Sequence, residues 1–447
     1  MRDMKRRTFL KTSTIAAPFF IVPRHVLGGP GYTSPGDKLN IAGIGIGGQG
    51  SSDLQEMESE NIIALCDVDW EKAAPVFERY PHAKRYHDFR EMLDTEKEID
   101  AVVIATPDHT HAIATMTAIV HGKHVFCEKP LTHTLHEARL IARTAKEAGL
   151  ATQMGNQGMA FEGNRLIKEW LADGAIGTVR EVHVWSDRPT HKGTTELYWP
   201  QGIEAPTDLP TKPESLDWDL WLGPAAERPY HPAYSHFVWR GWWDFGEGGL
   251  GDMGIHNIAP AYDALKLTAP TSVHASSTPA FPQTVPAASI VHYEFPANGD
   301  RPPLSLHWYD GGLLPPRPAQ LEDERELPKE DGLIFIGDDG AMLVDGWGGA
   351  SPRLLPESRM QEYAQPPKSL PRSIGHYAEW IKGCKDGTPT MSHFGFAGPL
   401  TEVCLLGLLS VRLGGKKLQW DAENMRVTND AEAIRLLHYD YRAGWSL

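Results

Sequence analysis

The chain has 447 residues, of which 41% are hydrophobic and 23% charged, as in an ordinary folded globular protein. Its net charge of -15 and isoelectric point of about 5.7 argue against nucleic acid or an anionic membrane surface as the main partner. The length exceeds what one hydrophobic core usually organises, so two domains are expected. The four cysteines are widely spaced and form no CxxC pair, which argues against a disulfide framework. Cys66 and Cys127 lie in apolar, strand-like runs, which favours small buried side chains over a reactive or metal-binding role.

The amino terminus has the pattern of an export signal. Arg6 and Arg7 precede an uncharged, moderately apolar stretch over 12–22, which is typical of a twin-arginine signal and too short for a permanent membrane span. A disordered basic tail is the competing interpretation. We predict a signal and linker over 1–35, the twin-arginine export machinery as a partner, and a periplasmic or otherwise exported protein. No Ala-x-Ala site stands near Leu27, so an uncleaved signal would tether the protein to the membrane.

Residues 36–160 are predicted to form an α/β domain of the Rossmann type. Apolar runs alternate with helical patterns along this region, and such alternation implies right-handed βαβ crossovers and a doubly wound parallel sheet. The expected strands are 39–44, 62–65, 101–105, 124–127 and 151–154, and the expected helices are 69–80, 109–120 and 134–148.

Residues 161–447 follow a different pattern. Apolar and polar residues alternate over 179–185 and, less cleanly, over 289–295, which is typical of half-exposed antiparallel strands. Proline, glycine and tryptophan are frequent between these runs. We predict an α+β domain built on an open, mainly antiparallel sheet with long loops.

A GxGxxG motif directly follows the first expected strand. It comprises Gly45, Gly47, Gly48, Gln49 and Gly50. Its glycines permit a tight turn, close approach of a pyrophosphate, and close packing of helix on strand. The pattern alone is weak, but its position at the first βα turn predicts a dinucleotide site.

Asp67 ends the second expected strand, seventeen residues beyond Gly50. A carboxylate there binds ribose hydroxyls and repels a 2′-phosphate, which favours NAD over NADP. A turn or helix-capping role is the competing interpretation, although Asp69 is equally able to cap the next helix.

Thr106, Pro107 and His109 follow the strand over 101–105 and are expected to contact the nicotinamide half of the cofactor. His109 and His111 invite a metal-site interpretation, but their spacing does not suit one helical face. No metal is predicted, and simple helix capping is the alternative for this segment.

Glu128, Lys129 and Pro130 end the strand over 124–127, which places an ionisable pair at the rim of the sheet where such folds bind ligands. Lys129 supplies positive charge for a developing alkoxide, and Glu128 tunes it beside the cofactor. A solvated lysine at a strand end is the alternative. A cis Lys129–Pro130 bond would aim the amine.

Asp252 and His256 are four residues apart in a glycine-rich segment. On a helix they would face the same way, so that the carboxylate orients an imidazole able to exchange a proton with an alcohol. A capping aspartate with a structural histidine and half of a metal site are the alternatives.

Together these motifs resemble the Gfo/Idh/MocA family of sugar and polyol oxidoreductases over nearly the whole chain from Lys38. The resemblance implies that Lys129 binds the reacting hydroxyl, that His256 exchanges its proton, and that Asp252 supports them. It also implies that Asn156 and Gln157 lie near the nicotinamide, and that the open sheet forms a homo-oligomer interface.

The loop over 239–244 is also typical of one branch of that family. Trp239 is expected to stack against a sugar, with Arg240 or Asp244 bonding its hydroxyls, and burial of these aromatic residues in the core is equally favoured.

The leading functional hypothesis is an NAD(P)-dependent oxidoreductase acting on a secondary hydroxyl of a sugar, polyol or glycoside. The alternative is a glycosidase or lyase in which tightly bound NAD transiently oxidises the sugar before elimination. A catalytically silent sugar-binding protein is a third hypothesis.

Overall fold

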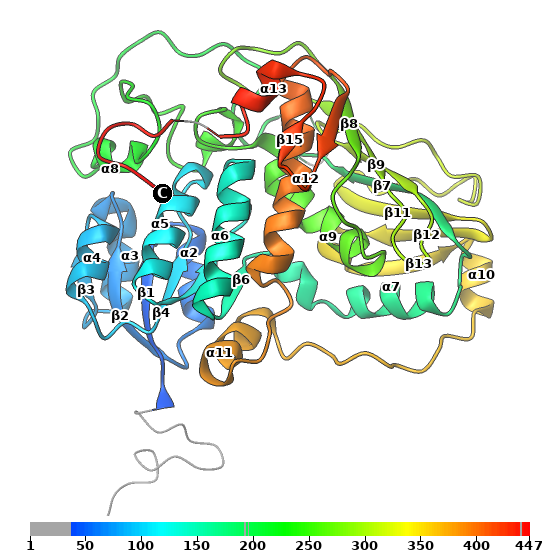
Figure 1. Cartoon of the computed structure of the whole chain (residues 1–447), viewed down its shortest axis with the longest axis horizontal. Coiled ribbons are helices and arrows are strands. Elements are labelled where there is room, and N and C mark those ends of the chain that lie inside the picture. Colours follow the sequence, from blue (N-terminus) through cyan, green and yellow to red (C-terminus); the bar gives the residue numbers. More distant parts are fainter. Residues whose placement is uncertain (1–36, 192–193, 195, 439) are drawn as a thin grey trace, which may run out of the picture. The chain divides into compact units, whose positions relative to one another are not determined.

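The computed structural model describes residues 37–191, 194, 196–438 and 440–447, so the predicted export signal lies outside the described residues. The region from Asn40 onward contains two β-sheets, which Figure 1 shows with their flanking helices.

The first sheet has six strands, all parallel, in the order β3-β2-β1-β4-β5-β6. Its strands are β1 (Asn40–Ile44), β2 (Asn61–Cys66), β3 (Lys84–Tyr86), β4 (Ala101–Ile104), β5 (His124–Cys127) and β6 (Thr152–Met154). The strand order reverses between β1 and β4, and in open α/β sheets ligands bind outside the carboxyl ends of the strands at this point.

Five helices connect these strands: α2 (Gln49–Glu56), α3 (Trp70–Arg79), α4 (Phe89–Thr95), α5 (Asp108–Val120) and α6 (Leu135–Ala148). Because parallel crossovers are right-handed, α2 and α3 cover one face of the sheet and the other three helices cover the opposite face. The strands and helices predicted for this region agree with the structure to within one or two residues. The exceptions are β3 and α4, which were not predicted, and α2, which was expected after the glycine motif without stated bounds.

The second sheet has nine strands in the order β13-β12-β11-β7-β10-β9-β8-β14-β15, and only β7 and β10 pair in parallel. Its strands are β7 (Val179–Ser186), β8 (Ser272–Ser277), β9 (Ser289–Phe295), β10 (Leu304–Tyr309), β11 (Asp331–Gly337), β12 (Gly340–Asp345), β13 (Ser351–Leu355), β14 (Leu418–Asp421) and β15 (Arg426–Val427). The predicted fold class, a parallel Rossmann sheet followed by a mainly antiparallel one, is confirmed.

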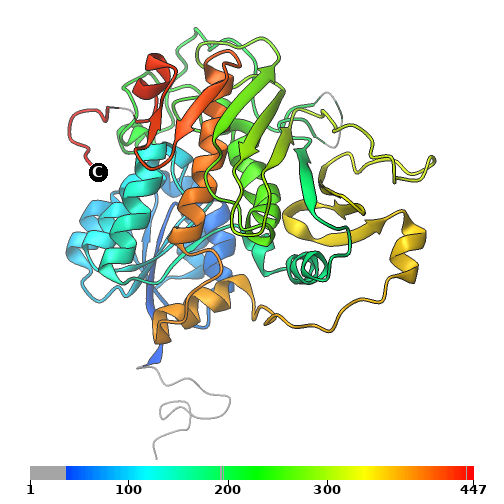
Figure 2. The same cartoon turned by 45° about the vertical axis from the view of Figure 1, so that its right-hand side comes forward.

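The remaining helical segments surround this sheet and join it to the first. They are η3 (Gln157–Ala160), α7 (Glu162–Ala172), α8 (Trp218–Leu222), η4 (Val238–Gly241), the π-helical turn η5 (Leu250–Gly254), α9 (Ile255–Ala264), η6 (Trp347–Gly349), α10 (Glu357–Glu362), α11 (His376–Asp386), α12 (Phe394–Arg412) and α13 (Ala431–Arg435). Figure 2 shows the same elements from a second direction.

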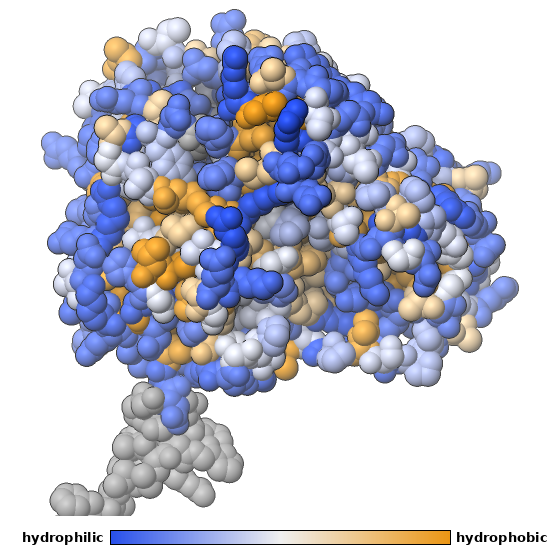
Figure 3. Space-filling view, in the orientation of Figure 1, coloured by the Kyte–Doolittle hydropathy of each residue, from blue (hydrophilic) through white to orange (hydrophobic). Residues whose placement is uncertain are grey.

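Helix α12 connects the two sheets through the core. It packs against α6 on one side and β8 on the other, and its apolar residues belong to one hydrophobic cluster that contains strand residues of both sheets. Its length and composition are those of a membrane span, but 83% of its apolar window is buried inside the protein. Hydrophobic side chains on the face seen in Figure 3 form small separate groups, as on an ordinary water-exposed surface.

Cys66 and Cys127 are buried, as predicted. Cys404 is also buried, Cys384 is partly buried, and all four are free thiols.

The turn after β1 depends on two glycines. Gly45 has a φ of 76°, and a side chain there would meet the backbone oxygen of Ala105 at 2.8 Å. A Cβ on Gly50 would lie 2.3 Å from the backbone oxygen of Gly45, so α2 could not pack as closely on the turn.

We expect Gly50→Ala to destabilise the protein and to weaken dinucleotide binding at least tenfold, because the turn must open to admit the methyl group. Ser52→Ala, at an exposed position on the same helix and outside the turn, is the control. Chemical denaturation and NADH fluorescence titration measure both effects. Equal behaviour of the two variants would contradict the packing argument.

Candidate functional site

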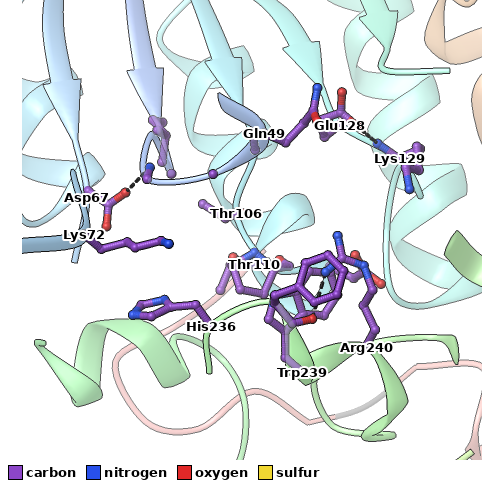
Figure 4. A pocket seen from close by; sticks show the side chains of 18 of the residues that line it. Gln49, Asp67, Lys72, Thr106, Thr110, Glu128, Lys129, His236, Trp239 and Arg240 are labelled. Atoms are coloured by element: carbon purple, nitrogen blue, oxygen red, sulfur yellow. Dashed lines mark hydrogen bonds between the residues drawn. The ribbon is translucent and has the colours of Figure 1, made fainter. Parts of the chain in front are cut away.

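A cavity of about 660 Å³ lies at the carboxyl ends of the six-stranded sheet. Loops of the first sheet form one wall, and η4, η6 and α9 from the second part of the chain form the other. Figure 4 shows Asp67 and Lys72 toward one end and Glu128 and Lys129 toward the other. The cavity therefore joins the predicted nucleotide and catalytic residues.

The glycine turn has the form expected for a pyrophosphate site. Helix α2 begins after Gly48, and no side chain caps its first N–H groups. Gly48 and Gln49 line the cavity, so the uncapped N–H groups and the positive end of the helix are open to an anion. Gly45 and Gly47 also line it, but their N–H groups donate to Cys66 and Asp67. Gly50 is buried beneath them and supports the turn.

Three backbone N–H groups hold the Asp67 carboxylate in position. Its Oδ2 accepts hydrogen bonds from the backbone N–H groups of Ile46 and Gly47 at 2.8 and 2.9 Å, and its Oδ1 accepts one from Asp69 at 2.9 Å. Burial raises the pKa of Asp67, although these bonds oppose the effect. Since a carboxylate has about four lone-pair positions, one remains for a ribose hydroxyl.

Asp69 caps α3, accepting hydrogen bonds from the N–H groups of Glu71 and Lys72. The capping role considered for Asp67 therefore belongs to its neighbour. His236, on the segment before η4, lies 2.9 Å from Asp69 Oδ2 and lines the same end of the cavity.

The end of β4 contributes Thr106 and Pro107 to the cavity wall. Thr106 Oγ1 is buried without a hydrogen-bond partner among the described residues, as expected of a group that awaits a bound molecule. His109 is different: it is fully buried, its Nε2 lies 3.0 Å from the backbone oxygen of Trp221, and it does not line the cavity. The structure thus gives His109 a packing position, away from the predicted cofactor contact.

His111 lies within 2.8 Å of the backbone oxygens of Thr106 and Pro130, so it links the end of β4 to the turn after β5. No group of three or more His, Cys, Asp or Glu side chains in the described ranges has the geometry to hold a metal ion.

Glu128 belongs to a buried hydrogen-bond network. Gln157 donates to Glu128 at 2.8 Å and to the Tyr377 hydroxyl at 3.2 Å, and Tyr377 donates to Asp53 at 2.8 Å. Burial and then the neighbouring Asp53 raise the pKa of Glu128 to about 8, and burial raises the pKa of Asp53 to about 6. Two carboxyl groups that resist ionisation therefore stand behind the glycine turn.

Lys129 is held by the second part of the chain. Its Nζ lies 2.6 Å from Asp252 Oδ1 and donates to the Asp252 backbone oxygen at 3.1 Å, while Arg240 Nε lies 3.2 Å from the same Oδ1. Burial alone would raise the pKa of Asp252, but the two cations outweigh it and lower the pKa. The Lys129–Pro130 peptide bond is cis.

The predicted pairing of Asp252 with His256 is not formed. Asp252 lies in the π-helical turn η5 and its carboxylate binds Lys129 and Arg240, whereas His256 is on α9. The i, i+4 argument assumed a regular α-helix, and the wider π-helical turn changes the direction of the side chain.

His256 lines the cavity beside Lys129 and is 7% exposed. Burial and then the nearby Lys129 lower its pKa to about 3. Its Nδ1 has no hydrogen-bond partner in the part of the chain that the structure describes. The imidazole is therefore neutral near pH 7 and able to accept a proton.

The remaining predicted residues divide into two groups. Trp239, Arg240 and Gln157 line the cavity. Asp244 instead forms an ion pair with Arg228, and Asn156 is fully buried, so neither belongs to the cavity wall. Trp242 is buried in the core, and Trp239 is also buried but lines the cavity, so stacking of Trp239 on a sugar stays a prediction.

Several cavity residues were not predicted as binding residues. Asp108, at the start of α5, is buried near Lys129 and Arg240, and burial raises its pKa despite these cations. Further examples are Lys72, His236, Arg188 and Trp347. The tryptophan between glycines at 346–349 could have been predicted as a binding residue from the sequence. The other residues reach the cavity only through contacts between distant parts of the chain.

The chain has relatives whose names describe sugar and polyol chemistry. Residues 39–156 match the "Oxidoreductase family, NAD-binding Rossmann fold", and 165–299 match the "Oxidoreductase family, C-terminal alpha/beta domain". Inositol 2-dehydrogenase of Salmonella typhimurium is 29% identical over 146 residues, which are 31% of this chain and 43% of that protein. 2,7-anhydro-N-acetylneuraminate hydratase of Mediterraneibacter gnavus is 31% identical over 133 residues, 29% of this chain and 34% of that one.

Among solved structures, "Levoglucosan dehydrogenase, complex with NADH and levoglucosan" has a TM-score of 0.56 at 16% identity and covers 86% of this chain and 99% of its own. This likeness shows a shared fold. The chain matches less than half the length of the two curated relatives.

The raised pKa of Glu128 predicts a pH-dependent stability. The carboxyl titrates near 4.5 in the unfolded chain and near 8 in the fold, so its contribution is complete below pH 4.5 and is lost as pH rises to about 8. Glu128→Gln removes this titration. In urea unfolding without cofactor, the variant should gain stability relative to the parent across that range.

Glu78→Gln, at an exposed carboxylate on α3, is the control. Parallel stability curves for the parent and Glu128→Gln would show that Glu128 does not titrate in this window.

Proposed function

Because the chain belongs to the Gfo/Idh/MocA family of oxidoreductases, we propose that it moves a hydride between nicotinamide and a secondary hydroxyl or ketone of a sugar, polyol or glycoside. The observation that carries this proposal is the meeting of Lys129 and His256 in one cavity with the glycine turn. One group is a fixed cation, and the other is a neutral base.

Lys129 and His256 have different roles in this proposal. An ammonium group has three N–H donors, and two from Lys129 go to Asp252, which leaves one for the substrate oxygen. That bond stabilises negative charge as the hydroxyl proton passes to the neutral imidazole of His256. Bound NAD⁺ supplies the acceptor for the hydride that leaves carbon. A ketone, a reduced nicotinamide and one proton result.

NAD is the proposed cofactor in preference to NADP. The position of Asp67 supports this preference, because a carboxylate beside the ribose repels a 2′-phosphate. Lys72 lies at the same end and works against this preference. Comparing the dissociation constants of NAD⁺ and NADP⁺ for the parent and Asp67→Ala tests the assignment, which fails if the parent binds NADP⁺ more tightly.

Lys129→Ala and His256→Ala should each lower kcat by roughly 10²-fold to 10⁴-fold, the usual effect of losing a positioned proton-transfer or charge-stabilising group. NADH binding should change little, because neither side chain holds the glycine turn. Lys146→Ala, at an exposed lysine on α6, is the control. Steady-state kinetics on sugars and cyclitols gives the comparison, and full activity of Lys129→Ala would exclude the mechanism.

A second candidate is a reaction without net redox change, in which tightly held NAD oxidises a sugar, elimination cleaves a bond, and the hydride returns. The supporting observation is the segment before η4 that closes over the nucleotide end of the cavity. Asp217 donates its backbone N–H to Val68 at 2.8 Å, Leu216 forms a β-bridge with Asp69, and His236 also contacts Asp69. In this proposal these contacts slow the release of the cofactor. One relative is named a hydratase.

The two candidates differ in what happens to added and bound cofactor. If the cofactor is retained, denaturing the purified protein releases nicotinamide, and native protein cleaves glycosides without added NAD and without net NADH absorbance. If the enzyme is a simple dehydrogenase, absorbance rises steadily with added NAD⁺. Cleavage that continues after the bound cofactor has been removed would exclude the second candidate.

We further propose export through the twin-arginine pathway and self-association through the nine-stranded sheet. The paired Arg6 and Arg7 support the first, and the resemblance to the family supports the second. Fractionation of cells that express the chain with both arginines intact or replaced by lysine tests export. Sedimentation of the purified protein tests association, and a monomer at micromolar concentration would refute it.

A further inference from the structure

The catalytic cavity continues past Trp347 into a second hollow of about 430 Å³. Glu330, Asp331 and Trp347 line both spaces, so the two are adjacent. The loop before β11 and the end of β12 form the rest of the second hollow. Its size is within the range of small-molecule sites.

Trp347 stands at the boundary between the two spaces, next to the proposed base. Its ring centroid lies 5.1 Å from that of His256 at an interplanar angle of 75°. Phe161 packs against it edge-on at 4.9 Å, yet 37% of Trp347 remains exposed. A large aromatic ring kept partly in water beside a catalytic group is a natural platform for the apolar face of a sugar.

The turn that carries Trp347 is rigidly held. Gly346, Gly348 and Gly349 all have positive φ angles, between 64° and 84°, which the chain reaches easily only with glycine. Gly348 donates its N–H to Asn257 at 3.0 Å and accepts from Asn164 at 2.8 Å. Because Asn257 directly follows His256, the turn fixes the position of Trp347 relative to the proposed base.

The charge of the second hollow favours a neutral occupant. Two cationic and four carboxylate side chains line it: Arg325, Lys329, Glu326, Glu330, Asp331 and Asp345. Arg325 lies within 4 Å of Glu322 and Glu357, and Lys329 within 4 Å of Glu326. The cations are thus already paired, and the excess carboxylates accept hydroxyl hydrogen bonds but repel a phosphate or uronate.

We propose that the second hollow binds a second, uncharged sugar unit, so that the substrate is a glycoside whose reacting ring lies at Lys129 and His256 and whose next ring passes Trp347. This inference rests on the proposed function for the position of the reacting ring. Trp347 then determines specificity for substrate length.

The test compares glucose, galactose and mannose with cellobiose, lactose and mannobiose, using protein loaded with cofactor. We expect kcat/KM for at least one disaccharide to exceed that of its non-reducing-end monosaccharide at least tenfold, mainly through KM. Trp347→Ala should reduce this advantage to less than twofold, and Trp347→Phe should keep most of it because a ring remains. Thermal melting checks that the variants are folded.

Asp345→Lys supplies an independent measurement at the exposed far wall of the hollow. It should raise the affinity for cellobionic acid, whose carboxylate is on the reducing-end unit, at least fivefold relative to cellobiose, measured by calorimetry on protein with bound cofactor. Turnover of monosaccharides with no disaccharide advantage would overturn the second-ring subsite while leaving the proposed function in place. Absence of turnover with every sugar, while cofactor binds, would instead overturn the proposed function.

Discussion

The ion pair between Lys129 and Asp252 joins the two halves of the candidate site. Lys129 follows β5 of the parallel sheet, whereas Asp252 lies in the π-helical turn before α9, and their charged atoms lie 2.6 Å apart with little exposure to water. Burying such a pair gives little net stability, because the desolvation cost offsets much of the attraction. Its value lies in placement, because it fixes one ammonium donor toward the cavity. Burial and then the nearby Lys129 lower the pKa of His256, whereas Asp252 opposes this shift, so the base is neutral.

Raised pKa values limit the negative charge that two buried carboxyl groups add beside the cavity. Glu128 and Asp53 have raised pKa values and share a chain of hydrogen bonds through Gln157 and Tyr377. Tyr377 comes from α11, far along the chain, so the C-terminal segment helps to set the charge behind the glycine turn. Such networks hold a site in one arrangement when their members are satisfied.

Sequence patterns predicted those parts of the site that depend on strand ends and on the turns after them. The turn at Gly45 and Gly50, the carboxylate at Asp67 and the pair at Lys129 each follow a strand end, and a strand end can be read from its apolar run. The strand β3 was missed because it is short, polar and at the sheet edge. The expected contact of Asp252 with His256 was wrong because a π-helical turn, which depends on tertiary packing, replaces the assumed α-helix.

Residues that meet only after folding were beyond the reach of pattern analysis. Asp244 and His109 were both expected in the site. Asp244 instead forms an ion pair with Arg228, and His109 packs among aromatic residues against Trp221. Conversely, Trp347 reaches the cavity only because its glycine turn packs on α9. The sequence therefore predicted the candidate catalytic and cofactor-binding residues better than it predicted the other residues that line the cavity.

The central claim is that hydride passes between a sugar carbon and a nicotinamide held beside Lys129 and His256. The most direct measurement is mass spectrometry of the nicotinamide after the protein is mixed with a sugar substrate deuterated at every ring carbon and quenched within one turnover. The account predicts deuterium at C4 of the nicotinamide with the parent protein and its absence with Lys129→Ala. Conversion of the sugar by the parent protein with no deuterium on the cofactor would contradict it.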